Sequence, residues 1–246
     1  SEYKNRVEII HAVYDELDEV LERLGITQVD GILFDLGVSS MQLDQADRGF
    51  AYSQDAPLDM RMDQSRGLSA LDILNTYSYG ELVRVIRNYG EEKFATKIAD
   101  NIIKARETKS LTTTKDLAEL VKDSIPAPAR RTGGNPAKRT FQALRIEVNQ
   151  ELAVLERAIP KAISAIRIGG RLVVMSYQSL EDKIVKRAFA DVVGSNSPLG
   201  LPFDLPNSAA SYKLVISGSE GASEDEIEIN ARAQSMRLRA LERVAA

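Results

Sequence analysis

The sequence predicts an α/β fold in which the sheet is interrupted by a helical insertion. Two short apolar runs, residues 30–35 and 171–177, indicate its central strands. Each run stops abruptly at polar residues, which suits a strand buried on both faces of a parallel sheet, although length alone does not exclude a buried helix. Several helical patterns separate the two runs, and two more strand-like segments follow the second. This order of elements is typical of an interrupted α/β sheet.

Composition narrows the class of protein. The chain has 246 residues, 43% of them hydrophobic and 28% charged, as in an ordinary soluble globular protein. It contains no apolar run of eighteen residues, so we expect no transmembrane helix and no membrane partner. There is no Cys and one His, His11, which argues against a metal site, disulfides or a histidine triad. These features fit a reducing, cytoplasmic location.

The first forty residues predict a strand, a helix and a second strand. Residues 7–10 read as a short strand, and the apolar face of residues 13–24 predicts a helix that Gly25 ends. The second strand stops at Asp35. Because ligands in open α/β sheets bind beyond the carboxyl ends of strands, Asp35 would stand at the rim of a binding crevice. The alternative is a loop Asp that caps the following turn.

The middle of the chain is predicted to be helical. A polar, aperiodic stretch occupies residues 44–67. Helical patterns then cover residues 69–75, 79–88, 91–106 and 114–124. Their expected start signals are Ser69, Ser78 and Thr114. Three Pro and a Gly-Gly pair within residues 125–136 mark a loop or linker.

The last part of the chain is predicted to return to the sheet. Residues 138–159 carry one apolar stripe and should form a long helix, kinked by Pro160 and closed at Gly169-Gly170. After the strand at 171–177, Ser179 should cap another helix, and the remaining strands are expected at residues 212–217 and 235–243. We therefore assign residues 1–48 and 136–246 to the sheet domain and residues 49–135 to the inserted helical domain.

A second polar strand end follows the second apolar run. It reads Ser176-Tyr177-Gln178-Ser179. If the two strands are parallel neighbours, this end and Asp35 converge on one crevice. Helix capping alone explains Ser179. It does not explain Tyr177 and Gln178, which could stack on a base and hydrogen-bond to it.

A cluster of positive charge follows the helical segments. Between Ser124 and Ile146 the sequence has no Asp or Glu and five cations: Arg130, Arg131, Lys138, Arg139 and Arg145. In a chain with a net charge of −4, this predicts a patch that contacts phosphates. A solvated face is the alternative. Arg145 shares a helix with the apolar stripe, so a structural ion pair is as reasonable for it as RNA contact.

Six segments carry a resemblance to a known family. They are DGILFDLGVSSMQLDQADRGFAY, APLDMRMD, YGEEKFATKIA, NPAKRTFQALRIEVNQEL, GGRLVVMSYQSLEDKIVK and NARAQSMRLRALERV. Together they are similar to the MraW (RsmH) family, in order and over nearly the whole chain. The TGGNPAKR and SYQSLED variants resemble its actinobacterial branch.

The resemblance implies an S-adenosyl-L-methionine-dependent methyltransferase of cytosine N(4) in 16S ribosomal RNA, within the small ribosomal subunit. It implies a class I methyltransferase (Rossmann-like) sheet with an inserted RNA-substrate domain, and a possible homodimer. Tyr14, Asp35 and Gln42 match the family's cofactor contacts, Tyr14 at the adenine. Asp35 also takes the position beside the target amine, where Tyr177 and Gln178 would face the flipped cytosine.

Two departures from the family are visible. Many relatives have His where this chain has Gln178, so a histidine general base is excluded there. The methylated amine is transiently cationic and acidic, and its proton can leave to water or a carboxylate. The family also begins with a strand, a Gly-rich cofactor loop and an acidic ribose-binding residue, which have no counterpart before Asp30. We therefore expect an N-terminally truncated sheet and a chain that is impaired or inactive by itself.

Two other functions remain open at this point. One is a noncatalytic relative that binds ribosomal RNA and has lost the cofactor half. The other is an unrelated nucleotide-binding α/β protein, which the sequence disfavours because it lacks a glycine-rich phosphate loop. The residues alone do not identify the target nucleotide, which comes only from the resemblance.

Overall fold

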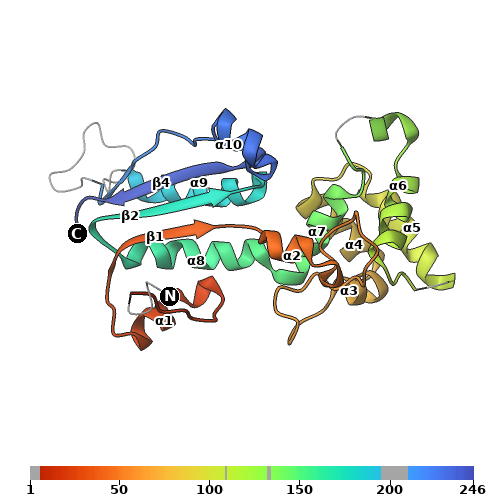
Figure 1. The fold of residues 1–246 in the computed structure, drawn as a ribbon, viewed down its shortest axis with the longest axis horizontal. Helices are drawn as coiled ribbons and strands as arrows, with labels where there is room; N and C mark the ends of the chain where they lie inside the picture. The colour runs from red at the N-terminus through yellow and green to blue at the C-terminus, as the bar shows by residue number, and fades with distance from the viewer. Residues whose placement is uncertain (1–5, 109, 132–133, 195–209) are drawn as a thin grey trace. The chain divides into compact units, whose positions relative to one another are not determined.

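A computed structural model describes residues 6–108, 110–131, 134–194 and 210–246 of the chain (Figure 1). The chain divides into two compact units. The sheet unit comprises residues 1–37 and 152–246, and the helical unit comprises residues 38–151. The mixed α/β architecture confirms the predicted fold class and is consistent with a class I methyltransferase sheet.

The sheet has four strands in the order β1-β2-β4-β3 among the described residues. Their bounds are β1 Val29–Asp35, β2 Ile166–Ser176, β3 Tyr212–Leu214 and β4 Arg237–Arg243. β1 and β2 are parallel, as predicted from the two apolar runs, whereas β4 is antiparallel to both β2 and β3. The register places Phe34 opposite Val174 and Asp35 opposite Met175. The carboxyl ends of β1 and β2 therefore meet at one edge of the sheet.

The core of the sheet unit lies on one face of β1 and β2. Phe34, Leu172 and Val174 are buried there with apolar residues of α8 (Glu151–Ala165) and α9 (Ser179–Val193). On β1 the neighbouring side chain Leu33 is 63% exposed. The prediction that this strand is buried on both faces was therefore wrong for the described chain, because side chains alternate between faces and only one face of β1 is covered.

The front of the chain differs from the prediction. Residues 7–10 form no strand, and Val7 and Ile9 are 58% and 91% exposed. Their β-branched residues have a high strand propensity, but a strand needs a partner and none pairs with them among the described residues. The predicted helix at 13–24 is present as the 3-10 helix η1 (Tyr14–Glu16) followed by α1 (Leu17–Arg23).

Ion pairs connect this front segment to α8. Arg157 donates to the Asp15 carboxylate, with Nη2 2.7 Å from Oδ2. Lys161 Nζ lies 2.6 Å from the Asp15 carbonyl oxygen and 2.7 Å from Asp18 Oδ1. The lowered pKa of Asp18, caused first by its hydrogen bond from Lys161, agrees with this contact. The front segment is thus fixed against the helix that leads into β2.

The helical unit contains the predicted helices. After α2 (Ser40–Asp44) and η2 (Ala46–Arg48), its longer elements are α3 Ala70–Thr76, α4 Tyr79–Gly90, α5 Ala95–Thr108, α6 Thr114–Ser124, η3 Ala127–Arg131 and α7 Lys138–Asn149. Ser69 and Ser78 cap α3 and α4 as predicted, whereas Thr113 rather than Thr114 caps α6. Buried Leu74, Ile98 and Leu144 lie in a core that these helices share.

The long helix predicted at 138–159 is broken. α7 ends at Asn149, Gln150 is left-handed with φ of 51°, and α8 begins at Glu151. Pro160 lies inside α8, so it does not cause the break. α8 ends at Ala165, and Gly169-Gly170 belong to β2 rather than to a helix end.

The unit boundaries also differ from the predicted domain boundaries. They fall at residues 37/38 and 151/152 rather than at 48/49 and 135/136. The physical reason is that α7 packs on α4 through its apolar stripe, with Phe141 and Leu144 in the helical core. The apolar stripe of the sequence is therefore divided between two cores at Gln150.

Two features are absent from the residues that the structure describes. None of the helices there is long and apolar enough to cross a membrane. The same ranges hold no cluster of three or more His, Cys, Asp or Glu side chains suited to a metal ion.

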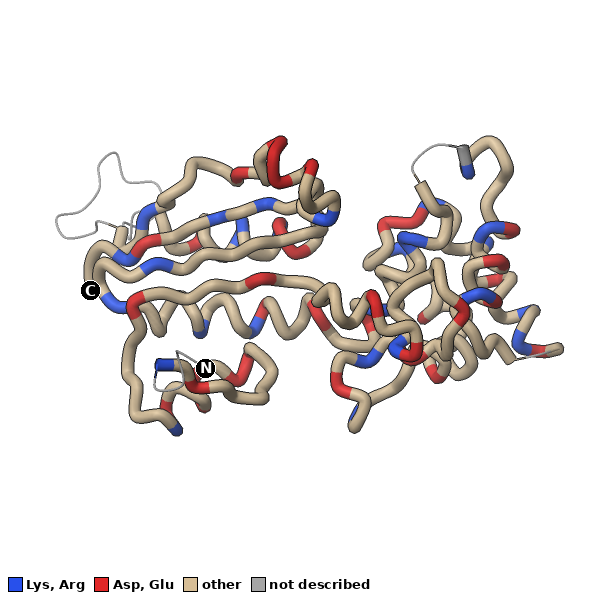
Figure 2. The backbone as a smooth tube through the Cα atoms, in the orientation of Figure 1, with Lys and Arg blue, Asp and Glu red and all other residues tan. Residues whose placement is uncertain are grey.

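The remaining elements of the sheet unit are short. α10 (Glu224–Ile229) lies between β3 and β4, and the 3-10 helix η4 (Ala231–Ser235) leads into β4. Ser223 caps α10 by accepting a hydrogen bond from the backbone N–H of Glu226, at 3.2 Å. Figure 2 shows the acidic residues gathered on this helix.

Candidate active site

The carboxyl ends of β1 and β2 bring two predicted site residues together. The Tyr177 hydroxyl donates a hydrogen bond to Asp35 Oδ1 at 3.0 Å. The backbone holds this geometry, because Leu36 N–H donates to the Met175 carbonyl oxygen at 3.0 Å, immediately beyond Asp35. The predicted convergence of the two strand ends is confirmed for Asp35 and Tyr177.

The electrostatics of this pair follow from its surroundings. Burial raises the pKa of the Tyr177 hydroxyl, and the hydrogen bond to Asp35 raises that pKa further. Tyr177 therefore keeps its proton at neutral pH and acts as a donor. Asp35 is exposed, and its second oxygen, Oδ2, has no hydrogen-bond partner among the described residues. The pair thus presents one oriented carboxylate oxygen as an acceptor.

Gln178 lies at the start of helix α9. It is the N-cap residue of α9, where Ser179 was expected, and its amide nitrogen lies 3.1 Å from Glu181 Oε1. Its amide is thereby engaged in the cap of the helix. The geometry supports a structural role for Gln178, and its predicted catalytic role gains no support from these contacts.

Glu181 is the residue that the sequence analysis missed. Its carboxylate is 3% exposed and accepts from the backbone N–H groups of Tyr177 at 2.9 Å and Gln178 at 3.2 Å. These bonds fix the turn that carries Tyr177. The signal was present in the sequence as the capping-box spacing of Gln178 and Glu181.

Tyr14 lies beside the buried end of β1. Its ring is 5.5 Å from that of Phe34, centroid to centroid, and is 37% exposed. Phe34 directly precedes Asp35, so the structure places Tyr14 near the strand end that carries the candidate carboxylate. The contact of Tyr14 with the adenine of the cofactor remains a prediction.

Gln42 belongs to the helical unit. Its side-chain oxygen accepts from Ser39 N–H at 3.0 Å, and its own N–H donates to Ser39 Oγ at 3.3 Å. These two bonds form the capping box of α2. The predicted cofactor contact of Gln42 is therefore untested, and the observed bonds explain the residue structurally.

The five predicted RNA-contacting cations have different environments. Arg145 forms a bidentate ion pair with Glu151, at 2.8 and 2.9 Å. This is the structural ion pair that the sequence offered as the alternative to RNA contact. Arg130 Nε donates to the Ile125 carbonyl oxygen at 2.6 Å. Lys138 and Arg139 are exposed at the start of α7. The side chain of Arg131 lies outside the described residues.

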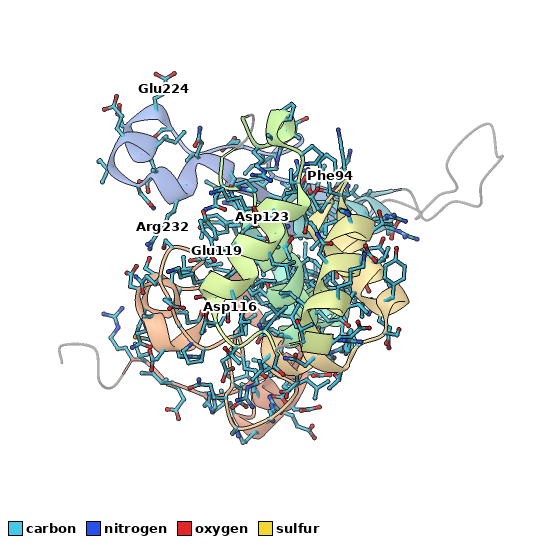
Figure 3. All side chains as sticks on the ribbon, turned by 90° about the vertical axis from the view of Figure 1, so that its right-hand side faces the viewer. Phe94, Asp116, Glu119, Asp123, Glu224 and Arg232 are labelled. Carbon is cyan, nitrogen blue, oxygen red and sulfur yellow. The ribbon has the colours of Figure 1, made fainter. Side chains whose placement is uncertain are left out.

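Acidic residues also lie close to this part of the chain. Asp116, Glu119 and Asp123 project from α6, as Figure 3 shows. Asp123 Oδ1 is 3.9 Å from Arg130 Nη2, so this cation is not without acidic neighbours. Among the described side chains, the exposed cations of this cluster are Lys138 and Arg139, and Arg139 Nη1 also donates to the Glu91 carbonyl oxygen at 3.1 Å.

The comparison with known proteins identifies the family. The sequence matches the MraW methylase family over residues 1–244. The chain belongs to the MraW methylase family. The expected resemblance is therefore confirmed, and the mixed α/β sheet is its methyltransferase sheet.

Curated relatives agree with this assignment. Proteins named ribosomal RNA small subunit methyltransferase H from Salinispora tropica and Renibacterium salmoninarum are 59% and 58% identical, each over 98% of this chain. The relative from Streptomyces avermitilis is 56% identical over the same share. The chain covers 65%, 73% and 76% of their respective lengths, and thus about two thirds of the Salinispora relative.

Proposed function

We propose that this MraW-family chain serves in the transfer of a methyl group from S-adenosyl-L-methionine to the exocyclic N4 amine of a cytosine in small-subunit (16S) ribosomal RNA, and that the chain by itself is impaired. The observation that carries the proposal is the 3.0 Å hydrogen bond from Tyr177 to Asp35 at the joined strand ends. It leaves an oriented carboxylate oxygen where an amine could donate. The names of the curated relatives support the substrate class.

The residues present suit this chemistry. Bound S-adenosyl-L-methionine supplies an electrophilic methyl group on a sulfonium sulfur. Asp35 Oδ2 accepts a hydrogen bond from the cytosine amine and so fixes the direction of the nitrogen lone pair. On receiving that methyl group the amine nitrogen would become cationic, and it would lose one proton to Asp35 or to water. Catalysis then rests on orientation and on a preorganised acceptor.

Tyr177 orients the carboxylate in this account. Its hydroxyl donates to Oδ1 and leaves Oδ2 for the substrate. The raised pKa of Tyr177 keeps this donor protonated. Tyr14, with its exposed ring beside Phe34, is suited to stack on the adenine of the cofactor. The residues present therefore suit the cofactor at its adenine and the cytosine at its reacting amine.

The helical unit is proposed to hold the RNA. Exposed Lys138 and Arg139 are suited to phosphate contacts, which position a nucleic acid without reading its sequence. The target base must leave its stack to reach Asp35, at a cost of a few kcal/mol that is lower in single-stranded RNA. We further propose that the substrate RNA is presented within the small subunit, in the cytoplasm.

Product analysis tests the proposal. Unmodified small ribosomal subunits would be incubated with S-adenosyl-L-methionine and either this chain or the chain extended with the family's front segment. The RNA would then be digested to nucleosides and examined by mass spectrometry. We expect N4-methylcytidine with the extended chain, and less or none with the chain alone. RNA binding without any methylated nucleoside would instead favour the noncatalytic alternative.

A further inference from the structure

Residues 59–69 of the helical unit form a closed surface loop. Its ends meet because Ala70 N–H donates to the Asp59 carbonyl oxygen at 2.8 Å. A second bond, from Leu71 N–H to the Leu58 carbonyl oxygen at 2.7 Å, closes the neck. Compact loops whose ends are joined in this way frequently carry function.

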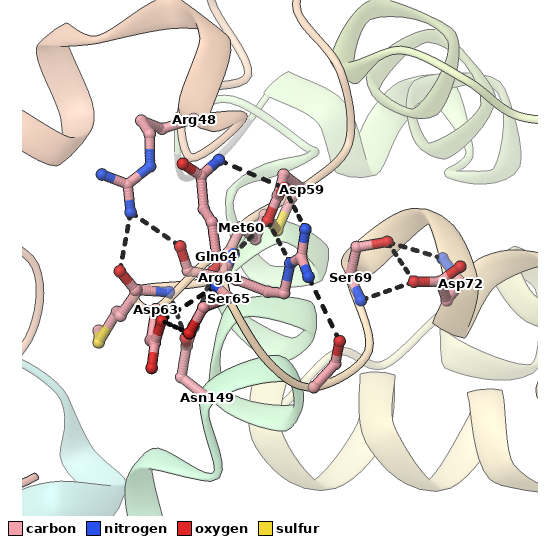
Figure 4. Close-up of polar contacts among 12 residues, drawn as sticks. Arg48, Asp59, Met60, Arg61, Asp63, Gln64, Ser65, Ser69, Asp72 and Asn149 are labelled. Carbon is pink, nitrogen blue, oxygen red and sulfur yellow. Dashed lines mark hydrogen bonds and ion pairs between the residues drawn. The ribbon is translucent and has the colours of Figure 1, made fainter.

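The base of this 59–69 loop is held by two side chains from distant parts of the sequence. Asn149 at the end of α7 accepts from Met62 N–H at 2.7 Å and donates to the Met60 carbonyl oxygen at 2.8 Å (Figure 4). Arg48 Nη2 donates to the carbonyl oxygens of Arg61 and Met62, both at 2.9 Å. The two side chains thus clamp the segment from opposite ends of the unit's sequence.

Every backbone polar group of residues 60–62 is hydrogen-bonded. The remaining two donors are Met60 N–H, to the Arg48 carbonyl oxygen at 3.0 Å, and Arg61 N–H, to Asp59 Oδ1 at 3.0 Å. None of these bonds belongs to the regular hydrogen-bonding pattern of a helix or a strand. Met60 is fully buried and has φ of 61°, a left-handed backbone that non-glycine residues rarely adopt. Such strain persists where the surroundings fix the conformation, and it clusters at functional sites.

The tip of the loop carries an oriented arginine. Asp63 accepts from Ser65 N–H at 3.0 Å and from Ser65 Oγ at 2.6 Å, which fixes the carboxylate. Arg66 Nε lies 2.9 Å from Asp63 Oδ2, while its side chain is 64% exposed. The ion pair with Asp63 therefore holds one side of the guanidinium, while most of the Arg66 side chain stays exposed.

We propose that Arg66 contacts a phosphate of the RNA substrate, that Asp63 positions the guanidinium, and that Asn149 and Arg48 hold the loop for this contact. This inference rests on the proposed function, because it takes RNA as the partner. The planar guanidinium suits bidentate contact with phosphate oxygens. Its fixed orientation lowers the entropy lost on binding. The clamp at the base explains why a strained backbone is retained under an exposed tip.

Salt-dependent RNA binding tests the phosphate contact. A fluorescent fragment of small-subunit ribosomal RNA would be titrated with the extended chain at several KCl concentrations. Arg66→Ala should weaken binding by about threefold to tenfold and reduce the log–log salt slope by about one, the change expected for one lost phosphate contact. Arg66→Lys should keep the slope and lose part of the affinity. The control is Arg87→Ala, an exposed arginine on α4, which should change neither.

The positioning role has its own comparison. Asn149→Ala and Asn75→Ala each remove a half-buried amide that binds two backbone carbonyl groups. Both should lower the melting temperature, but only Asn149→Ala should weaken RNA binding. Equal RNA binding by the two variants would overturn the role of Asn149.

An unchanged salt slope in Arg66→Ala would overturn the phosphate contact. If only binding to a protein of the small subunit changed, the partner class would be wrong. Product analysis with the unsubstituted extended chain separates the two proposals. If N4-methylcytidine forms and the salt slope of Arg66→Ala is unchanged, only the phosphate contact of Arg66 is contradicted. A reduced slope without methylated product defeats the proposed function while leaving the RNA contact in place.

Discussion

The hydrogen bond from Tyr177 to Asp35 joins two strand ends that are separated by most of the chain. Burial and the neighbouring carboxylate both raise the pKa of the Tyr177 hydroxyl. The tyrosine is therefore a donor over the whole neutral range, and it determines which Asp35 oxygen remains for a ligand. Glu181 supports the arrangement by fixing the backbone of Tyr177.

Removal of the Tyr177 hydroxyl should weaken the reaction without unfolding the chain. Tyr177→Phe leaves the Asp35 carboxylate free to rotate. We expect methyl transfer to fall about tenfold, the rate equivalent of one hydrogen bond of about 1.4 kcal/mol. The control is Tyr212→Phe, which removes a hydroxyl bonded to the Ile163 carbonyl oxygen at 3.1 Å in the same unit. A variant as active as this control would show that Tyr177 does not orient Asp35.

A second tyrosine predicts a pH dependence of stability. Burial, followed by the hydrogen bond to Glu147, raises the pKa of Tyr77 to about 12. An unfolded tyrosine titrates at about pH 10, so the folded state binds the hydroxyl proton of Tyr77 more tightly than the unfolded state does. Its contribution to stability is complete below about pH 10 and is lost as the pH rises toward 12.

Urea unfolding over this alkaline range measures the effect. The difference in free energy of unfolding between the unsubstituted chain and Tyr77→Phe should shrink as the pH rises from about 9 toward about 12. Tyr79→Phe, at a position that is 47% exposed, is the control and should keep a constant difference. If the difference for Tyr77→Phe also stayed constant with pH, the folded state would not bind the Tyr77 proton more tightly, and the prediction would be contradicted.

The sequence predicted the candidate site only for residues whose positions are determined by the ends of the two parallel strands. Asp35 and Tyr177 were found because polar residues directly follow two apolar runs, and parallel neighbours bring such ends together. The role of Gln178 does not follow from the sequence, because an amide beside an aromatic suits both base recognition and helix capping, and its predicted role stays a prediction. The Arg145–Glu151 ion pair could not be fixed in advance, because it depends on a left-handed residue between them.

At the scale of elements, the sequence predicted most helices and both parallel strands. The failures have identifiable causes. Residues 7–10 have strand propensity without a partner in the described chain. The break at Gln150 is invisible in the apolar stripe, because the stripe continues through both α7 and α8. The bonds that accompany the break are tertiary: Asn149 binds the segment at Met60 and Met62.

The turn after η2 supplies a prediction about an element. Gly49 has φ of 71°, and a Cβ there would lie 2.2 Å from the Pro57 carbonyl oxygen. Gly49→Ala should cost about 1–2 kcal/mol from the left-handed backbone and about 1–3 kcal/mol more from the clash. Gly67→Ala is the matched control, with φ of 78° and open space around the Cβ, and should show only the first cost. Equal losses in urea unfolding would contradict the proposed close approach.

At the scale of the whole molecule, the two units have separate cores. The helical core includes Leu74, Ile98 and Leu144, whereas the sheet core includes Phe34, Leu172 and Phe189. The helical unit is also one uninterrupted segment, residues 38–151. A domain with its own core is expected to fold alone.

Expression of residues 38–151 tests this independence. The fragment should give a helical circular dichroism spectrum and one cooperative thermal transition. A matched fragment, residues 49–135, lacks α7 and should lose the cooperative transition, because Phe141 and Leu144 belong to the helical core. If the shorter fragment folded equally well, the observed unit boundaries would not describe the folding unit.

The central claim is that Asp35 is the acceptor that orients the target amine. The most direct measurement compares methyl transfer to small ribosomal subunits by Asp35→Asn and Asp30→Asn variants of the extended chain. Both residues are exposed on β1, but Asp30 pairs with Arg167 at the opposite end of the strand. We predict that Asp35→Asn loses at least about a hundredfold in rate, the lower range for removal of a catalytic group, while Asp30→Asn retains normal turnover. Equal turnover by two folded variants would contradict the account.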